Sequence, residues 1–214
     1  MKKVHLHKWG VYLSYSLKVL IFLLLLLSIW RIHLVWIFGC SLGLLVSFIP
    51  TILKRNYQLH LPLILEILIT IALLLHIGGG LLNAYRDIPQ YDTFTHFISS
   101  FLVAFLAFVI IYILDEYWDG LTMDKYAMAF VVVILTVAIG VIWEFNEWFT
   151  DLLFGTHEQW GYDDTIKDLF IDMLAGLFMA ILGVRLIKRG SFEELTDDFG
   201  DQLDKRIIQK RLKG

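Results

Sequence analysis

Residues 19–30 read VLIFLLLLLSIW, an apolar run with five consecutive leucines. Together with the residues before it, this run gives an apolar segment at 11–30, about 20 residues long, which is the length an α-helix needs to cross a bilayer. Lysines precede the segment, as in a secretory signal, but no small-residue cleavage site follows it. We therefore expect a retained membrane-spanning helix.

Five further apolar segments follow, at about residues 32–53, 61–82, 92–114, 125–149 and 165–187. Of the 214 residues, 58% are hydrophobic and 18% are charged, whereas soluble domains are about 45–50% apolar and about 25% charged. This composition excludes a disordered chain and an ordinary soluble enzyme. The sequence predicts an all-α, polytopic integral membrane protein with a six-helix transmembrane bundle over residues 1–190. The single cysteine, Cys40, excludes an intramolecular disulfide and a thiolate metal cluster.

Residues 191–214 differ in composition from the apolar segments. Ser191 and Glu194 have the spacing of a capping box, acidic residues come first and basic residues come last. That order of charges matches a helix dipole. We expect an amphipathic C-terminal helix in the cytoplasm, either solvated or in contact with anionic lipid or a partner.

The distribution of lysine and arginine predicts the orientation, because cytoplasmic loops carry the excess of positive charge. With six spans both termini lie on one side, and that side holds most of the basic residues, including Lys54, Arg55, Lys125 and the basic tail. The opposite side holds only Arg31, Arg86 and Lys167. We expect a protein of the cytoplasmic membrane with cytoplasmic termini and with loops 83–91 and 150–164 facing outward.

Two ionisable residues fall within spans near the predicted cytoplasmic side. Lys18 lies in the first span, and we expect its side chain to extend toward the N-terminal side of the membrane. Glu66 lies near the cytoplasmic end of the third span, and we expect an interfacial position for it.

Most other ionisable residues within the spans gather at the predicted outward ends of the last three, and such groups are costly in a membrane. Spacing places them on shared helix faces: Asp92 and His96 are four residues apart, and Glu144 and Glu147 are three apart. A third row, at four-residue spacing, is formed by Asp164, Asp168 and Asp172. Small residues continue these rows, so the acidic faces are expected to point into the bundle.

Ten acidic residues in the predicted outward half stand against three basic ones. Crowded carboxylates at reduced dielectric need protons, water or a bound cation. A divalent metal resolves this most directly, and oxygen ligands with one imidazole suit Mg²⁺, Mn²⁺, Fe²⁺ or Ca²⁺, with Zn²⁺ also open. The metal ligands we expect are Asp92, His96, Glu144, Glu147, Asp164, Asp168 and Asp172.

Structural roles compete with metal binding at each of these positions. Asp92 and Asp164 also suit helix N-caps, and Glu144 and Glu147 also suit the membrane interface beside Trp143 and Trp148. The aspartates of the last span also suit hydrogen bonds between helices.

Four stretches carry a resemblance to known families. Residues 91–97 (YDTFTHF), 143–148 (WEFNEW), 162–168 (YDDTIKD) and 172–176 (DMLAG) resemble the YjdF-like family of prokaryotic inner-membrane proteins, a family without an assigned function. The likeness covers about residues 60–187. More distantly, the pattern resembles VanZ-like membrane proteins, which are associated with glycopeptide resistance. Those usually have Gln where Glu147 stands and Asn where Asp172 stands, so the present site is more acidic.

Three classes of function fit this pattern. The first is a metal-dependent membrane enzyme that acts on a lipid or lipid-linked envelope precursor, with Glu147 as the general base. The second is an ion- or metal-coupled transporter, and the third is a structural or lipid-binding protein whose acids bond helices together. Nucleic-acid binding has no support, and the P-loop, the dinucleotide glycine motif and the nucleophile elbow are absent from the sequence.

Overall fold

The computed structural model describes residues 2–57, 62–117 and 120–192, and the described chain is helical without a strand. The long helices are α1 (Lys2–Trp30), α2 (Leu34–Tyr57), α3 (Leu63–Leu81), α5 (Tyr91–Tyr117), α6 (Lys125–Phe154) and α7 (Tyr162–Lys188), with the short α4 (Ala84–Asp87) between α3 and α5. All six long helices are long and apolar enough to cross a membrane. The prediction of an all-α polytopic protein is confirmed.

The described helices group into two compact units, one within residues 1–95 and one over 96–194. The single membrane domain over 1–190 stays a prediction. Of the predicted tail helix at 191–214, only Ser191 and Phe192 are described, both helical, and the rest lies outside the described residues.

In the first unit, α1, α2 and α3 pack together around Ile21, Cys40, Ile77 and Leu81. A polar contact joins the same helices: Lys18 on α1 forms an ion pair with Glu66 on α3. Lys18 is only 2% exposed, so the prediction that its side chain extends toward the membrane surface is wrong. The interfacial position of Glu66, whose side chain is 20% exposed, stays a prediction. The two charges neutralise each other, and burial in an apolar surrounding is tolerated when charges are paired.

The same pair is completed by neighbouring side chains. Ser14 Oγ donates a hydrogen bond to Glu66 Oε1 at 2.7 Å, and the Lys18 ammonium lies 3.4 Å from Thr51 Oγ1 on α2. The ammonium also lies over the rings of Tyr15 and Phe48. Lys18 is thereby surrounded by groups from all three helices.

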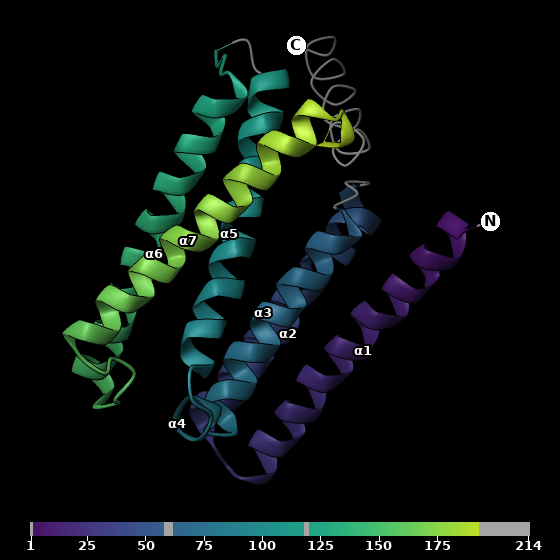
Figure 1. Cartoon of the computed structure of the whole chain (residues 1–214). Helices are drawn as coiled ribbons and strands as arrows, with labels where there is room; N and C mark the ends of the chain where they lie inside the picture. Colours follow the sequence, from purple (N-terminus) through teal and green to yellow (C-terminus); the bar gives the residue numbers. More distant parts are fainter. Residues whose placement is uncertain (1, 58–61, 118–119, 193–214) are drawn as a thin grey trace, which may run out of the picture. The chain divides into compact units, whose positions relative to one another are not determined.

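In the second unit, α6 and α7 lie side by side, as the green and yellow ribbons show (Figure 1). Phe108 of α5 is fully buried and packs against Phe192, at 5.2 Å between ring centroids. Gly183 of α7 leaves room for the Phe108 ring, because a Cβ there would overlap it.

A glycine follows the last residue of α6, and another glycine precedes the first residue of α7. α6 continues to Phe154, beyond the predicted end at 149, and stops where Gly155 adopts a left-handed conformation with φ 64°. α7 begins at Tyr162, before the predicted start at 165, after Gly161 with φ 114°. Glycine adopts such positive φ values without the strain that a Cβ would add. The acidic residues of both ends therefore lie within regular helix.

Candidate metal centre and neighbouring pocket

Asp172 is the most enclosed of the predicted site residues, with 1% of its surface exposed. Its Oδ1 accepts a hydrogen bond from Ser100 Oγ of α5 at 2.6 Å. His96, one turn earlier on α5, brings its Nδ1 to 3.3 Å from the same oxygen. A carboxylate only accepts hydrogen bonds, so this contact favours the His96 tautomer that carries a proton on Nδ1.

The other oxygen of Asp172 faces α6. A Cβ built at Gly140 would collide with Asp172 Oδ2, so only glycine leaves room for the carboxylate there. Thr136, one turn before Gly140 on α6, packs closely against Gly176, one turn after Asp172 on α7, where an added Cβ would lie 3.2 Å from the Thr136 Cβ. Asp172 Oδ2 is buried and has no hydrogen-bond partner within the described chain. The close approach of α6 and α7 therefore encloses a carboxylate.

Asp92, His96 and Asp168 form the group whose geometry suits a metal ion. One ligand atom from each residue lies within 4.8 Å of the others. Asp92 stands one turn before His96 on the same uninterrupted helix, and Asp168 stands one turn before Asp172 on α7. Asp168 and His96 are buried, and Asp92 is half-buried. The i, i+4 spacing on two neighbouring helices brings these groups together.

Charges around this group are mostly acidic. The ammonium of Lys167 approaches this group, with its Nζ 3.1 Å from Asp164 Oδ1 and 4.0 Å from Asp168 Oδ1. Its side chain is 46% exposed, so solvent weakens its effect on the buried carboxylates.

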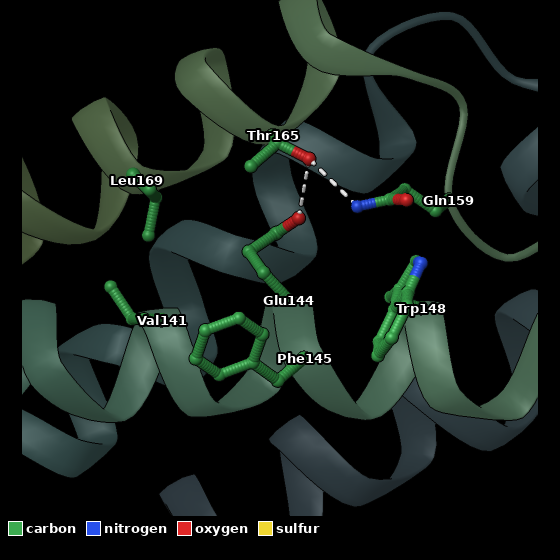
Figure 2. Close-up of a pocket in the computed structure, with 7 residues that line it drawn as sticks. All are labelled: Val141, Glu144, Phe145, Trp148, Gln159, Thr165 and Leu169. Atoms are coloured by element: carbon green, nitrogen blue, oxygen red, sulfur yellow. Dashed lines mark hydrogen bonds between the residues drawn. The ribbon is translucent and has the colours of Figure 1, made fainter.

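Glu144 belongs to a separate pocket beside α6 and α7, with a volume of about 380 Å³ (Figure 2). Glu144 reaches from α6 toward α7, where its Oε2 accepts a hydrogen bond from Thr165 Oγ1 at 2.8 Å. Gln159 in turn donates to Thr165 Oγ1 at 3.2 Å. Glu144 is 6% exposed, and its Oε1 is buried without a hydrogen-bond partner among the described residues. The pocket lining comprises Val141, Glu144, Phe145, Trp148, Gln159, Thr165 and Leu169.

Asp151 holds the loop that carries Gln159. Its Oδ1 accepts hydrogen bonds from Thr156 Oγ1 and the Glu158 backbone, and its Oδ2 accepts one from the Gln159 backbone at 3.0 Å. The Gly155 N–H donates to the Asp151 carbonyl, which closes the end of α6. This carboxylate therefore orders the loop that forms one side of the pocket.

The remaining predicted ligands are not members of this group of three. Glu147 Oε1 accepts a hydrogen bond from Trp143 Nε1 at 2.9 Å, one turn away on its own helix. Asp164 pairs with Lys167 and is partly exposed. Glu144 faces Thr165 and the pocket, and Asp172 contacts His96. Metal binding and catalysis at these positions stay predictions.

Three side chains that hydrogen-bond within these clusters were not anticipated from the sequence. Ser100 follows Asp92 and His96 at the same four-residue spacing, so this spacing could have predicted that Ser100 lies on the same helix face. Thr165 and Gln159 carry no such pattern, because their contacts depend on how the loop at 155–161 folds back.

Comparisons with known proteins agree with the membrane architecture. A family described as "Predicted membrane protein (DUF2238)" matches residues 12–189. An uncharacterised protein of Thermotoga maritima is 31% identical over 167 residues, which make up 77% of this chain and 84% of the relative. No solved structure matches the chain. DUF2238 is YjdF-like, whereas these matches give the VanZ-like resemblance no support. The family match and the relative both span most of the chain, and the protein therefore belongs to the DUF2238 family of predicted membrane proteins.

Proposed function

We propose that this membrane protein binds a divalent cation through Asp92, His96 and Asp168 and uses it in a metal-dependent reaction. The observation that carries the proposal is the approach of three ligand atoms, one from each residue, to within 4.8 Å of one another. Two carboxylates and an imidazole are a common ligand set for Mn²⁺, Fe²⁺ and Zn²⁺, and carboxylates alone dominate Mg²⁺ and Ca²⁺ sites.

Asp172 is not one of the three proposed ligands, but its contact with His96 supports the assignment of His96 as a metal ligand. Histidines that bind metals commonly donate their second ring N–H to a carboxylate, which fixes the ring and raises its basicity. The contact between His96 Nδ1 and Asp172 Oδ1 has this form, with Ser100 holding the carboxylate from the other side. In the proposal, His96 offers Nε2 to the cation.

For the reaction we propose Lewis-acid activation of a phosphate or carbonyl oxygen on a lipid or lipid-linked envelope substrate. The site lies near the start of α5 and of α7, at the ends that the distribution of lysine and arginine assigns to the outer side. A substrate would therefore come from the outer leaflet. Glu147, the proposed general base, is held by Trp143 on the adjacent turn of α6.

Ion- or metal-coupled transport is the second candidate, and the buried carboxylates favour it. Glu144 Oε1 and Asp172 Oδ2 have no hydrogen-bond partner in the described part of the chain, as expected for groups that take up a proton or a cation. Flux of the bound cation across sealed vesicles, lost in Asp168→Asn, would select transport over catalysis.

The test is elemental analysis of detergent-purified protein. We expect near-stoichiometric divalent metal in the wild type and its loss in Asp168→Asn, a change that keeps the shape of the side chain and removes its charge. Glu116→Gln, at an exposed position near the other end of α5, is the matched control and should retain the metal. Thermal unfolding would confirm that both variants fold. A wild type that takes up no divalent ion even when the ions are supplied would overturn the proposal.

A further inference from the structure

The pocket beside Glu144 has a lining that shares no residue with the Asp92, His96 and Asp168 group. Its volume of about 380 Å³ lies within the range of about 300–1,000 Å³ that small-molecule sites occupy. We propose that this pocket binds an amphiphile with a primary ammonium head group, which donates a hydrogen bond to the Glu144 carboxylate. The proposal stands without the cation site.

The polar side of the pocket lacks one donor. Thr165 donates to Glu144 Oε2, and Gln159 donates to Thr165, so the orientation of this chain of hydrogen bonds is fixed toward the carboxylate (Figure 2). Glu144 Oε1 remains buried with no hydrogen-bond partner in the described chain. A buried acceptor without a donor is costly, and a ligand N–H would satisfy it.

The charge of the lining favours a cationic head. Glu144 is the ionisable residue among the seven described lining residues, and Lys and Arg are missing from them. An anionic head would therefore meet the Glu144 carboxylate without a compensating cation among the described lining residues. An ammonium supplies both the opposite charge and the N–H groups.

The remaining lining accommodates an apolar body. Val141, Phe145, Trp148 and Leu169 contribute aliphatic and aromatic surface. Phe145 and Trp148 are also exposed, and we expect exposed apolar side chains of a membrane-spanning helix to face lipid. An alkyl chain can therefore extend from the pocket into the hydrocarbon layer without crossing a polar surface.

The test uses Trp148 as a reporter. Full-length protein in detergent micelles is titrated with a bromine-terminated undecylammonium, because bromine quenches indole fluorescence on contact. We expect saturable quenching in the wild type, most of it lost in Trp148→Phe. Glu144→Gln should weaken binding at least tenfold, whereas the control Glu116→Gln should leave it unchanged.

Two further probes need no variant and keep the test valid if Glu144→Gln does not fold. The matching trimethylammonium keeps the charge but has no N–H, and the matching alcohol has a donor but no charge. We expect both to bind at least tenfold more weakly than the primary amine. Equal quenching by all three, or equal affinity in folded Glu144→Gln, would overturn the proposal and indicate partition into the micelle.

The ammonium has two natural sources, a free long-chain amine and an aminophospholipid. Nanodiscs with bromine-labelled acyl chains separate them. Stronger Trp148 quenching by phosphatidylethanolamine than by phosphatidylcholine would identify the lipid, and equal quenching by the two lipids together with tight binding of the free amine would identify a soluble amine. Metal content measured on the same Glu144→Gln sample should match the wild type, which separates this proposal from that of the cation site.

Discussion

Asp172 occupies a position where three helices limit the space around one carboxylate. Ser100 and His96 contact its Oδ1 from α5, and the backbone at Gly140 closes against its Oδ2 from α6. The side chain is therefore fixed by shape as well as by hydrogen bonds. Adding a single methyl group at Gly140 should therefore displace the Asp172 carboxylate or the helix that carries it.

We expect Gly140→Ala to destabilise the protein by about 1–3 kcal/mol, the usual cost of overpacking a buried contact. The added Cβ would overlap Asp172 Oδ2 and push α6 and α7 apart. The measurement is the midpoint of thermal unfolding in detergent, followed by far-ultraviolet circular dichroism.

Gly78→Ala is the matched control for this prediction. Gly78 lies inside α3, where an added Cβ would meet Leu24 at an ordinary 3.8 Å. Alanine is the better helix former, so this variant should be as stable as the wild type or slightly more so. Equal midpoints for the two alanine variants would show that Gly140 is not a close contact.

Residue spacing predicted some contacts of the candidate site but not the different hydrogen-bond partners of residues on one helix face. The rows Asp92–His96 and Asp168–Asp172 follow from helical periodicity, and the structure groups members of both. Glu144 and Glu147 also share a face by spacing, yet one bonds Thr165 and the other bonds Trp143. That difference depends on side-chain rotamers and on the neighbouring loop, which spacing within one helix does not encode.

Helix packing decides the environment of Lys18 in the first unit. The ammonium is paired with Glu66 on α3 and lies beside Thr51 on α2, so one side chain links three helices. Apolar runs predicted each of these helices, but no sequence pattern within a helix says which helices become neighbours. That is why the ion pair was not foreseen.

Removing one partner of this pair should cost more than removing both. Lys18→Met leaves the Glu66 carboxylate without its cation, and breaking a buried pair in this way costs about 3–5 kcal/mol. The double variant Lys18→Met/Glu66→Leu should recover most of that loss, because no charge remains to be buried. The measurement is the free energy of unfolding in mixed micelles for the two single variants and the double variant.

Additive losses of unfolding free energy in the Lys18 and Glu66 variants would contradict this prediction. If the loss in the double variant equals the sum of the losses in the single variants, Lys18 and Glu66 do not interact. Thr150→Val offers a control, since its hydroxyl donates only to a backbone carbonyl of its own helix on an exposed surface. It should change the unfolding free energy little.

At the scale of the whole molecule, the described chain has six helices of membrane-spanning length, and we expect an even number of crossings to leave both termini on the same side. The excess of lysine and arginine predicts that this side is the cytoplasmic one. The native Cys40 is fully buried, so introduced cysteines can report on sidedness without background labelling.

We expect a membrane-impermeant maleimide to label Asp87→Cys and His157→Cys in intact cells. Asn56→Cys should react only after the membrane is permeabilised. All three positions are exposed, so differences in labelling report on the membrane barrier and not on burial. The wild type, with Cys40 alone, should stay unlabelled throughout. The reverse pattern would invert the orientation and place the candidate metal centre on the cytoplasmic side.

The central claim is that His96 and two aspartates bind one divalent cation. X-ray absorption spectroscopy of the metal-loaded protein tests it most directly, because an imidazole ligand gives a characteristic outer-shell scattering pattern. We predict one imidazole among oxygen ligands in the wild type and its disappearance in His96→Gln. An all-oxygen shell in the wild type, or an imidazole signal that persists in His96→Gln, would contradict the account.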